Sequence, residues 1–329
     1  MKTHNKLMSV PEVNALVASN RILALAGNEN VLKQISKGRW IGGTIPYFMN
    51  DSGGCMDKER VFVTDFTDVI SDFKICDYNT DDLSSLTNER FNGGFSWLLV
   101  PGFSQIHYKF ALEVGSYNNL FEIPVMGWIT GIDLNELGKN SPKVVNGLTG
   151  TFFENSAVAL HASLPNNKYA NLEIINLFEQ GNGDTITFNE DGFSARECLV
   201  NGKTMNFASY ITQNKIDTRL PLVADYSGAM INISIQSVDQ EKGVAFYAPV
   251  LKNIEYKIAK PVNNYIKAFN QVIPAETEKV IGSCNCILNY LYSELEGKKT
   301  GDLTGPITFG EIAYVLVNQT MVFMTIEDK

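Results

Sequence analysis

The sequence is poor in cysteine and histidine, the residues on which much metal and thiol chemistry depends. It has 5 cysteines and 3 histidines among 329 residues. The cysteines are odd in number and scattered, which is typical of reduced thiols rather than of a disulfide framework. Cys284 and Cys286 have no second Cys or His pair at the spacing of a structural zinc site, so we predict no metal site.

Long apolar runs and long basic runs are absent too. No window approaches the roughly 18 uninterrupted apolar residues of a transmembrane helix, and the N-terminus lacks the apolar region of a signal peptide. The chain carries 27 basic and 36 acidic residues, a net charge of −9, with no Lys/Arg run longer than two. We therefore expect a cytoplasmic protein that binds neither nucleic acid nor membrane.

Common catalytic motifs are missing as well. The chain has no Gly-x-x-x-x-Gly-Lys-Ser/Thr loop, no Gly-x-Ser-x-Gly elbow and no His-Glu-x-x-His pair. Gly181-Asn-Gly183 lacks the third glycine and the following helix of a dinucleotide-binding loop. These absences disfavour the common nucleotide and hydrolase chemistries.

A core and a mixed pattern of secondary structure are present. Hydrophobic residues make up 44% of the chain, which is enough for one large domain or two smaller ones. Residues 21–26, 28–37 and 40–44 have the pattern of a strand-helix-strand unit, and 61–66 with 69–76 that of a hairpin. Beyond residue 120, extended runs separated by Gly and Asn-Gly turns suggest an antiparallel meander. We predict an α+β fold of mixed, mostly antiparallel sheets layered with helices.

The most patterned stretch is the run from Gly301 to Phe323. An extended apolar run is interrupted by Gly310-Glu311 and followed by a second alternating run, which predicts a strand, a kink and another strand. A carboxylate at position 311 is unusual inside such a run. Either the kink is a bulge that leaves Glu311 at the solvent edge, or the glycine lets a ligand approach and Glu311 pairs with it.

Three segments resemble the FIST family. The segment GPITFGEI, preceded by Cys284-Asn285-Cys286, is similar to the end of FIST proteins, and residues 195–211 are similar to that family's domain junction. Residues 40–49 resemble its N-terminal motif; Gly43 and Thr44 match, whereas the motif's cysteine, second glycine and glutamate are absent. The resemblance implies two associated domains: an N-terminal helical extension at 1–20, a FIST N-like domain at 21–198 and a FIST C-like domain at 199–329.

The resemblance also implies a function. FIST proteins are regarded as sensory, small-ligand-binding modules of bacteria and archaea, with amino acids proposed as ligands. Packing of the two resembling halves face to face would bring seven motif residues into one ligand pocket: Gly43, Thr44, Cys284, Asn285, Phe309, Gly310 and Glu311. Such a set suits a small zwitterion whose amino group pairs with Glu311. No signalling output module is visible in the chain, so a sensor of this kind would act on a separate signalling protein.

Two other classes of function stay open. In a cofactor-free enzyme, Cys284 at a helix N-terminus and Glu311 would carry the chemistry, although no histidine lies in a recognisable catalytic context. In a structural or oligomeric interaction protein, the motif residues would be buried with no concave site beside them. We predict no cofactor; haem, described for some FIST proteins, is the alternative, with His107 or His161 as its axial ligand.

Overall fold

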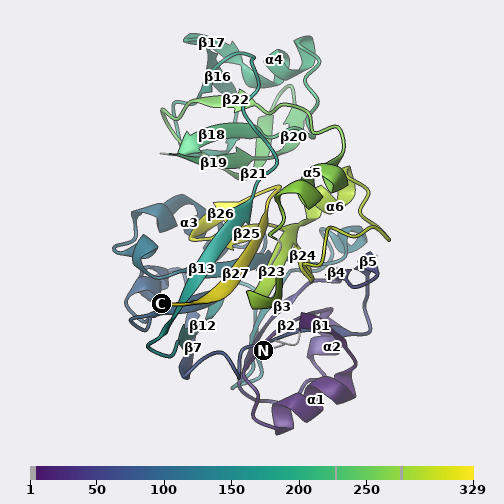
Figure 1. The fold of residues 1–329 in the computed structure, drawn as a ribbon. Helices are drawn as coiled ribbons and strands as arrows, with labels where there is room; N and C mark the ends of the chain where they lie inside the picture. Colours follow the sequence, from purple (N-terminus) through teal and green to yellow (C-terminus); the bar gives the residue numbers. More distant parts are fainter. Residues whose placement is uncertain (1–4, 227, 275–276) are drawn as a thin grey trace.

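The computed structural model describes residues 5–226, 228–274 and 277–329 (Figure 1). It confirms an α+β fold whose sheets are mostly antiparallel. Among the described strands, three pairs are parallel, namely β2 with β3, β8 with β9 and β23 with β24, and two of them form the site described below.

Two six-stranded sheets pack together in the lower part of Figure 1. The first has the order β1 (Asn5–Met8), β6 (Val61–Asp65), β2 (Leu23–Gly27), β3 (Trp40–Thr44), β10 (Val144–Asn146), β11 (Thr151–Phe153). The second has the order β26 (Val315–Val317), β25 (Glu311–Ala313), β9 (Val125–Thr130), β8 (Gly94–Pro101), β12 (Ala157–Ser163), β7 (Asp72–Tyr78). Strand β1 makes the predicted helical extension part of the first sheet, since its backbone pairs with β6; residues 1–4 of that extension lie outside the described residues.

A third six-stranded sheet joins distant parts of the chain. Its order is β13 (Lys168–Ile175), β27 (Met321–Asp328), β23 (Val280–Cys286), β24 (Gly305–Thr308), β4 (Tyr47–Asn50), β5 (Gly53–Met56). Strands from both sides of residue 199 pair here, β13 with β27 and β24 with β4, and β25 likewise pairs with β9 in the second sheet. The boundary predicted at residue 199 is therefore not a division between sheets.

The upper part of the molecule is formed by the segment between β13 and β23 (Figure 1). One sheet there has the order β17 (Lys203–Asn206), β16 (Glu197–Val200), β14 (Ile186–Thr187), β22 (Tyr256–Ile258), β18 (Leu222–Tyr226), β19 (Ala229–Ile233). The other has the order β15 (Gly192–Ala195), β21 (Gly243–Val250), β20 (Ile235–Asp239). The predicted Asn201-Gly202 hairpin turn joins β16 to β17, and both residues have the positive φ that such a turn requires.

The helices are short and cover the edges and faces of the sheets. They are α1 (Val10–Ala18), α2 (Glu29–Leu32), α3 (Gln105–Glu113), α4 (Phe207–Gln213), α5 (Tyr265–Val272) and α6 (Ile287–Tyr292). Turns of 3-10 helix occur at η1 (Leu83–Thr87), η2 (Val114–Ser116), η3 (Leu120–Glu122), η4 (Leu134–Glu136) and η5 (Thr277–Lys279). Helix α1 begins with a capping box, in which Glu12 accepts hydrogen bonds from the amide and hydroxyl of Ser9. No helix in the described residues is long and apolar enough to cross a bilayer.

Local patterns predicted the elements better than their pairing. The strand-helix-strand unit is confirmed, with β2 parallel to β3, although α2 is much shorter than the predicted helix 28–37. The predicted hairpin of 61–66 with 69–76 is wrong, because β6 pairs with β1 and β2 whereas β7 pairs with β12. The meander is wrong at β9, which lies parallel to β8. Pairing depends on contacts between distant residues, which periodicity does not report.

Candidate functional site

The ends of two parallel strand pairs meet between the first and second sheets. Strand β3 ends at Thr44, whose carbonyl oxygen accepts a hydrogen bond of 2.8 Å from the amide of Gly131, the residue after β9. Close approach depends on glycine, because a Cβ at Gly43 would lie 2.5 Å from the ring of Trp128. In α/β sheets, ligands bind at the carboxyl ends of parallel strands. The C-terminal ends of β3 and β9 therefore form one candidate site.

A polar cavity of about 510 Å³ opens at this junction. Its volume lies within the range of small-molecule sites. Thr44, one of the seven predicted residues, lines it together with Asn28, Glu29, Asn30, Lys33, Lys58, Glu136, Asn140 and Lys143. We call this cavity the polar pocket.

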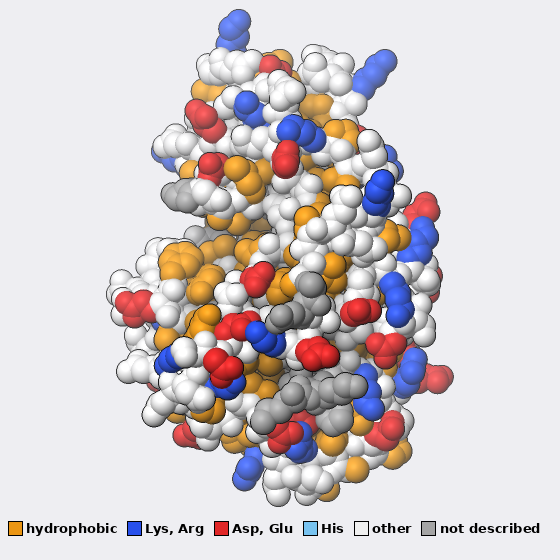
Figure 2. Space-filling view, viewed as in Figure 1, with side chains coloured by type: hydrophobic (Ala, Val, Ile, Leu, Met, Phe, Trp, Pro, Cys, Tyr) orange, Lys and Arg blue, Asp and Glu red, His pale blue; other side chains and the backbone are white. Residues whose placement is uncertain are grey.

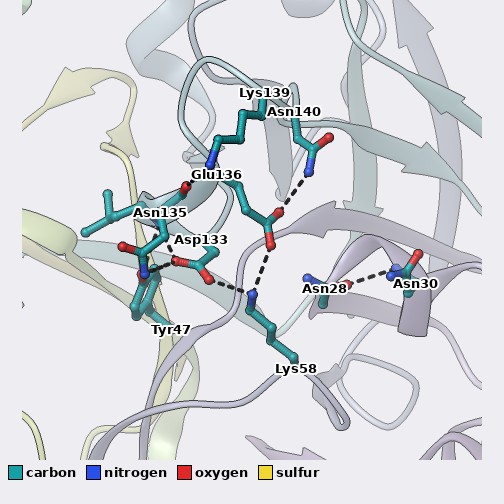
Figure 3. Close-up of polar contacts among 10 residues, drawn as sticks. Asn28, Asn30, Tyr47, Lys58, Asp133, Asn135, Glu136, Lys139 and Asn140 are labelled. Atoms are coloured by element: carbon teal, nitrogen blue, oxygen red, sulfur yellow. Dashed lines mark hydrogen bonds and ion pairs between the residues drawn. The ribbon is translucent and has the colours of Figure 1, made fainter.

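One wall of the polar pocket is held by Lys58 (Figure 3). Its ammonium lies 2.9 Å from Glu136 Oε1 and is also paired with Asp133, which is buried. Asp133 accepts further hydrogen bonds from the backbone and side chain of Asn135. The hydrogen bonds from Lys58 lower the pKa of Asp133 and of Glu136, and both carboxylates raise the pKa of Lys58. All three groups are therefore charged at neutral pH.

A second charged group stands on the side of α2. Lys143 Nζ lies 2.8 Å from both carboxylate oxygens of Glu29, and Lys33 Nζ lies 2.7 Å from Glu29 Oε1. Burial raises the pKa of Glu29, but the two lysines outweigh it and the net shift is downward. The backbone amide of Lys143 donates to Thr44 Oγ1 over 2.9 Å, which ties the end of β3 to this group.

Lys58 and Glu136, which both line the polar pocket, keep spare hydrogen-bonding capacity. A lysine ammonium has three donors, and Lys58 uses two of them on Asp133 and Glu136. A carboxylate has about four lone-pair sites, and Glu136 accepts bonds from Lys58 and Asn140. Asn28 and Asn30 lie near the point where Lys58 meets Glu136 (Figure 3). The walls therefore offer both an ammonium donor and a carboxylate acceptor to a bound molecule.

Phe309 and Gly310 lie at the kink between β24 and β25. The backbone there bonds to Ile129 of β9, with the Phe309 amide 3.1 Å from its oxygen and the Gly310 oxygen 2.8 Å from its amide. Phe309 packs on Gly131, where an added Cβ would lie 2.4 Å from the ring. It also lines a separate aromatic cavity of about 240 Å³ beside His107. The kink thus supports the junction without lining the polar pocket.

Glu311 is fully buried, so the interpretation that placed it at the solvent edge is wrong. Thr320 Oγ1 donates to Glu311 Oε2 over 2.8 Å, and Thr308 Oγ1 donates to Oε1 over 3.3 Å. Burial raises the pKa of Glu311 to about 8, although these hydroxyls lower it. At neutral pH the side chain is mainly protonated, and it does not line the polar pocket, so the predicted pairing with a ligand amine has no geometric support there.

Cys284 and Asn285 belong to the interior of β23. The strand continues through Cys286, so Cys284 lies two residues before the N-cap of α6, not at the helix N-terminus that the sequence suggested. Burial, together with the nearby Glu311, raises the pKa of the Cys284 thiol well above its ordinary value. Asn285 accepts hydrogen bonds from the Cys286 amide and the Asn289 side chain. Cys284, Asn285 and Glu311 are therefore buried in the core and do not line the polar pocket.

Neither predicted haem-binding histidine presents a lone pair suited to iron. The Nε2 atom of His161 lies 2.7 Å from the hydroxyl of Tyr78, and its Nδ1 atom lies 2.8 Å from that of Ser96. His107 Nδ1 accepts the amide hydrogen of Phe103 over 3.2 Å, which places the ring proton on Nε2. Burial lowers the pKa of both histidines to about 4, so they are neutral. The two histidines therefore do not fit the role of an axial haem ligand.

The residues of the polar pocket other than Thr44 were not predicted. Lys58, Glu136 and Lys143 lie in connecting segments with no motif around them, and their positions depend on sheet pairing. One local signal was available: Asp133 follows the buried strand β9 within three residues, where carboxylates often face a site. Within the described ranges, no group of three or more His, Cys, Asp or Glu side chains is arranged to hold a metal ion.

Fold and site together define an α+β protein with a charged pocket at the ends of parallel strands. The chain belongs to a family of unknown function (DUF6976), whose model matches residues 8–327. A comparison with curated proteins found no match.

Proposed function

We propose that this protein is a small-ligand-binding protein whose polar pocket takes a small zwitterion such as an amino acid. The observation that carries the proposal is the pairing of an ammonium donor, Lys58, with a carboxylate acceptor, Glu136, on the wall of a 510 Å³ cavity. A zwitterion supplies the complementary pair: its carboxylate joins the lysine and its ammonium joins the glutamate. A ligand with a single charge would form an ion pair with only one of these two residues, Lys58 or Glu136.

Thr44 supports the same site. Its side chain lines the polar pocket, and its hydroxyl both accepts from and donates to the backbone of Lys143. This arrangement ties the end of β3 to the backbone of the second lysine, Lys143, which also lines the polar pocket. The resemblance of the sequence to FIST proteins also points to small ligands and supports the proposal. The proposed protein is a cytoplasmic sensor that acts on a separate signalling protein.

The test is a thermal-shift screen of the purified protein against glycine, glutamate, lysine and γ-aminobutyrate, which differ in the number of their charged groups or in the distance between them. A ligand at a hundred times its Kd adds about 2.7 kcal/mol of stability. We expect at least one shift in the wild type that Lys58→Gln abolishes. Lys74→Gln is the matched control, because Lys74 is as exposed as Lys58 (37% against 35%) and pairs with Glu89 away from the polar pocket. Absence of any shift, or an equal shift in Lys58→Gln, would overturn the proposal.

The enzyme alternative is less well supported. A cofactor-free thiol enzyme needs an accessible thiolate, whereas Cys284 is fully buried with a raised pKa. We therefore propose binding rather than catalysis as the function of the site.

A further inference from the structure

A second, apolar cleft lies between the lower body and the upper sheets, away from the polar pocket. Figure 2 shows it as a hollow with hydrophobic side chains on both sides. Its volume is about 610 Å³, well within the range of small-molecule sites. We call it the apolar cleft.

The lower wall of the apolar cleft comes from α3 and its continuation. The buried stripe of α3 consists of Ile106 and Phe110, continued by Val114, and faces the core. Leu112 lies on the other side of the helix, where a polar residue is usual, and is 42% exposed. Phe121, just beyond, is 64% exposed. Large apolar side chains gathered around a cavity mark a binding surface more often than scattered ones do.

The upper wall comes from β19 and the end of β21. Ile231 and Ile233 lie two residues apart and so share the face of β19 that lines the apolar cleft. Pro249 and Leu251 continue this wall from β21 into the following loop. Val315 and Leu316 of β26 close the bottom. A molecule between the two walls would contact apolar side chains on both sides.

The rim of the apolar cleft carries one cation and one anion. Lys252 is exposed there, and its ammonium forms no ion pair with any residue that the structure describes. Asp191 already accepts a hydrogen bond of 2.6 Å from the Lys252 amide. That hydrogen bond comes from the neutral backbone amide, so the Lys252 ammonium keeps its three donors, and the carboxylate of a bound molecule can accept from them.

We propose that the apolar cleft binds an amphipathic carboxylate, a molecule with an unbranched apolar chain that lies between α3 and β19 and a carboxylate that pairs with Lys252. This site does not depend on the polar pocket or its ligand. A second copy of the chain is the competing occupant. The experiment below distinguishes it from the amphipathic carboxylate.

The experiment is a calorimetric titration of the full chain with hexanoate, octanoate and decanoate, and with decanol and decylamine as head-group controls. Burial of each added CH2 group should tighten binding about fourfold. Lys252→Gln should weaken decanoate binding about two- to fivefold, as expected for an exposed ion pair, and leave decanol binding unchanged. Lys242→Gln is the matched control, because Lys242 is also exposed and its amide also donates to an aspartate, Asp239.

Two variants block the apolar cleft itself. Ala111→Trp fills it from α3, and Leu112→Glu adds a negative charge at a side chain that already reaches solvent. Each should weaken decanoate binding more than tenfold, and Leu112→Glu keeps the test valid if Ala111→Trp does not fold. Any of four results would overturn the proposal: no saturable decanoate binding below about 1 mM, affinity independent of chain length, tighter binding of decylamine than of decanoate, or wild-type affinity in Leu112→Glu. A concentration-dependent dimer that Leu112→Glu dissociates would overturn it as well, in favour of a second copy.

Discussion

The amide of Gly131 donates a 2.8 Å hydrogen bond to the carbonyl oxygen of Thr44, and this bond joins the ends of β9 and β3. Thr44 is the last residue of a strand in the first sheet, Gly131 follows a strand of the second sheet, and the polar pocket opens where they meet. The ring of Phe309 also packs against Gly131. One glycine thus links the first sheet, the second sheet and the kink before β25.

We predict that Gly131→Ala destabilises the protein by about 1–3 kcal/mol, the usual cost of overpacking. The added Cβ would lie 2.4 Å from the Phe309 ring, so the ring or the strand must move. Urea unfolding measures the difference. Gly183→Ala is the control, because a Cβ there meets nothing within 4 Å, and this variant should be neutral or slightly stabilised. Equal stability of both variants would show that the junction is loosely packed.

The pKa of Glu311 predicts a dependence of stability on pH. Its pKa is raised from 4.5 to about 8 in the folded state, so the folded protein retains a proton that the unfolded chain loses. The contribution of this group is therefore greatest below pH 4.5, falls by about 1.4 kcal/mol per pH unit as pH rises toward 8, and levels off above it. Glu311→Gln, which cannot ionise, should lack this fall. Urea unfolding of both proteins from pH 5 to 9 tests it; parallel curves would contradict the prediction.

Thiol labelling separates the binding protein from a thiol enzyme. We expect Cys284 and Cys286 to remain unlabelled by iodoacetamide at pH 7 in the folded protein, because both are buried and their pKa values are raised well above normal. Cys55 and Cys76 are partly exposed and should react first. Peptide mapping by mass spectrometry identifies the labelled sites, and labelling in urea supplies the fully accessible reference. Rapid native labelling at Cys284 would support the enzyme alternative.

His161 provides a test of the buried polar contacts in the second sheet. Its ring bonds both Tyr78 and Ser96, so His161→Leu removes a hydrogen bond from each hydroxyl and leaves that of Ser96 without a partner, whereas Tyr78 keeps its contact with the Cys76 thiol. We expect a loss of about 1–3 kcal/mol for the unpaired Ser96 hydroxyl. Unfolding of the double variant His161→Leu/Ser96→Ala, which removes one of those hydroxyls, should recover part of the loss. No recovery would mean that the cost comes from packing alone.

The sequence predicted local elements well because their causes are local. The Asn201-Gly202 turn and strand β3 depend on neighbouring residues, and both an Asn-Gly turn and a strand at 40–44 were expected. The site was harder to predict. Thr44 was identified through its motif, but Lys58 precedes β6 and Lys143 precedes β10, and both reach the polar pocket only through the pairing of these strands with β2 and β3, which no short-range pattern encodes.

Glu311 is a residue that the sequence singled out but whose surroundings it did not predict. The sequence marked it as unusual, and the structure explains why: two threonines, Thr308 and Thr320, supply hydroxyls that allow a carboxyl group to be buried. Thr320 is nine residues away and is brought near by the return of the chain into β27. The sequence can thus identify an unusual residue, whereas the environment and role of that residue depend on contacts with residues far away in the sequence.

The most direct test of the polar pocket is an NMR titration that follows backbone amide signals during addition of glutamate and of γ-aminobutyrate. We predict saturable shifts for Asn28, Thr44 and Gly131, lost in Lys58→Gln and retained in Lys74→Gln. Absence of saturable shifts up to about 10 mM ligand, or shifts confined to α3 and β19, would contradict a zwitterion site at the ends of β3 and β9.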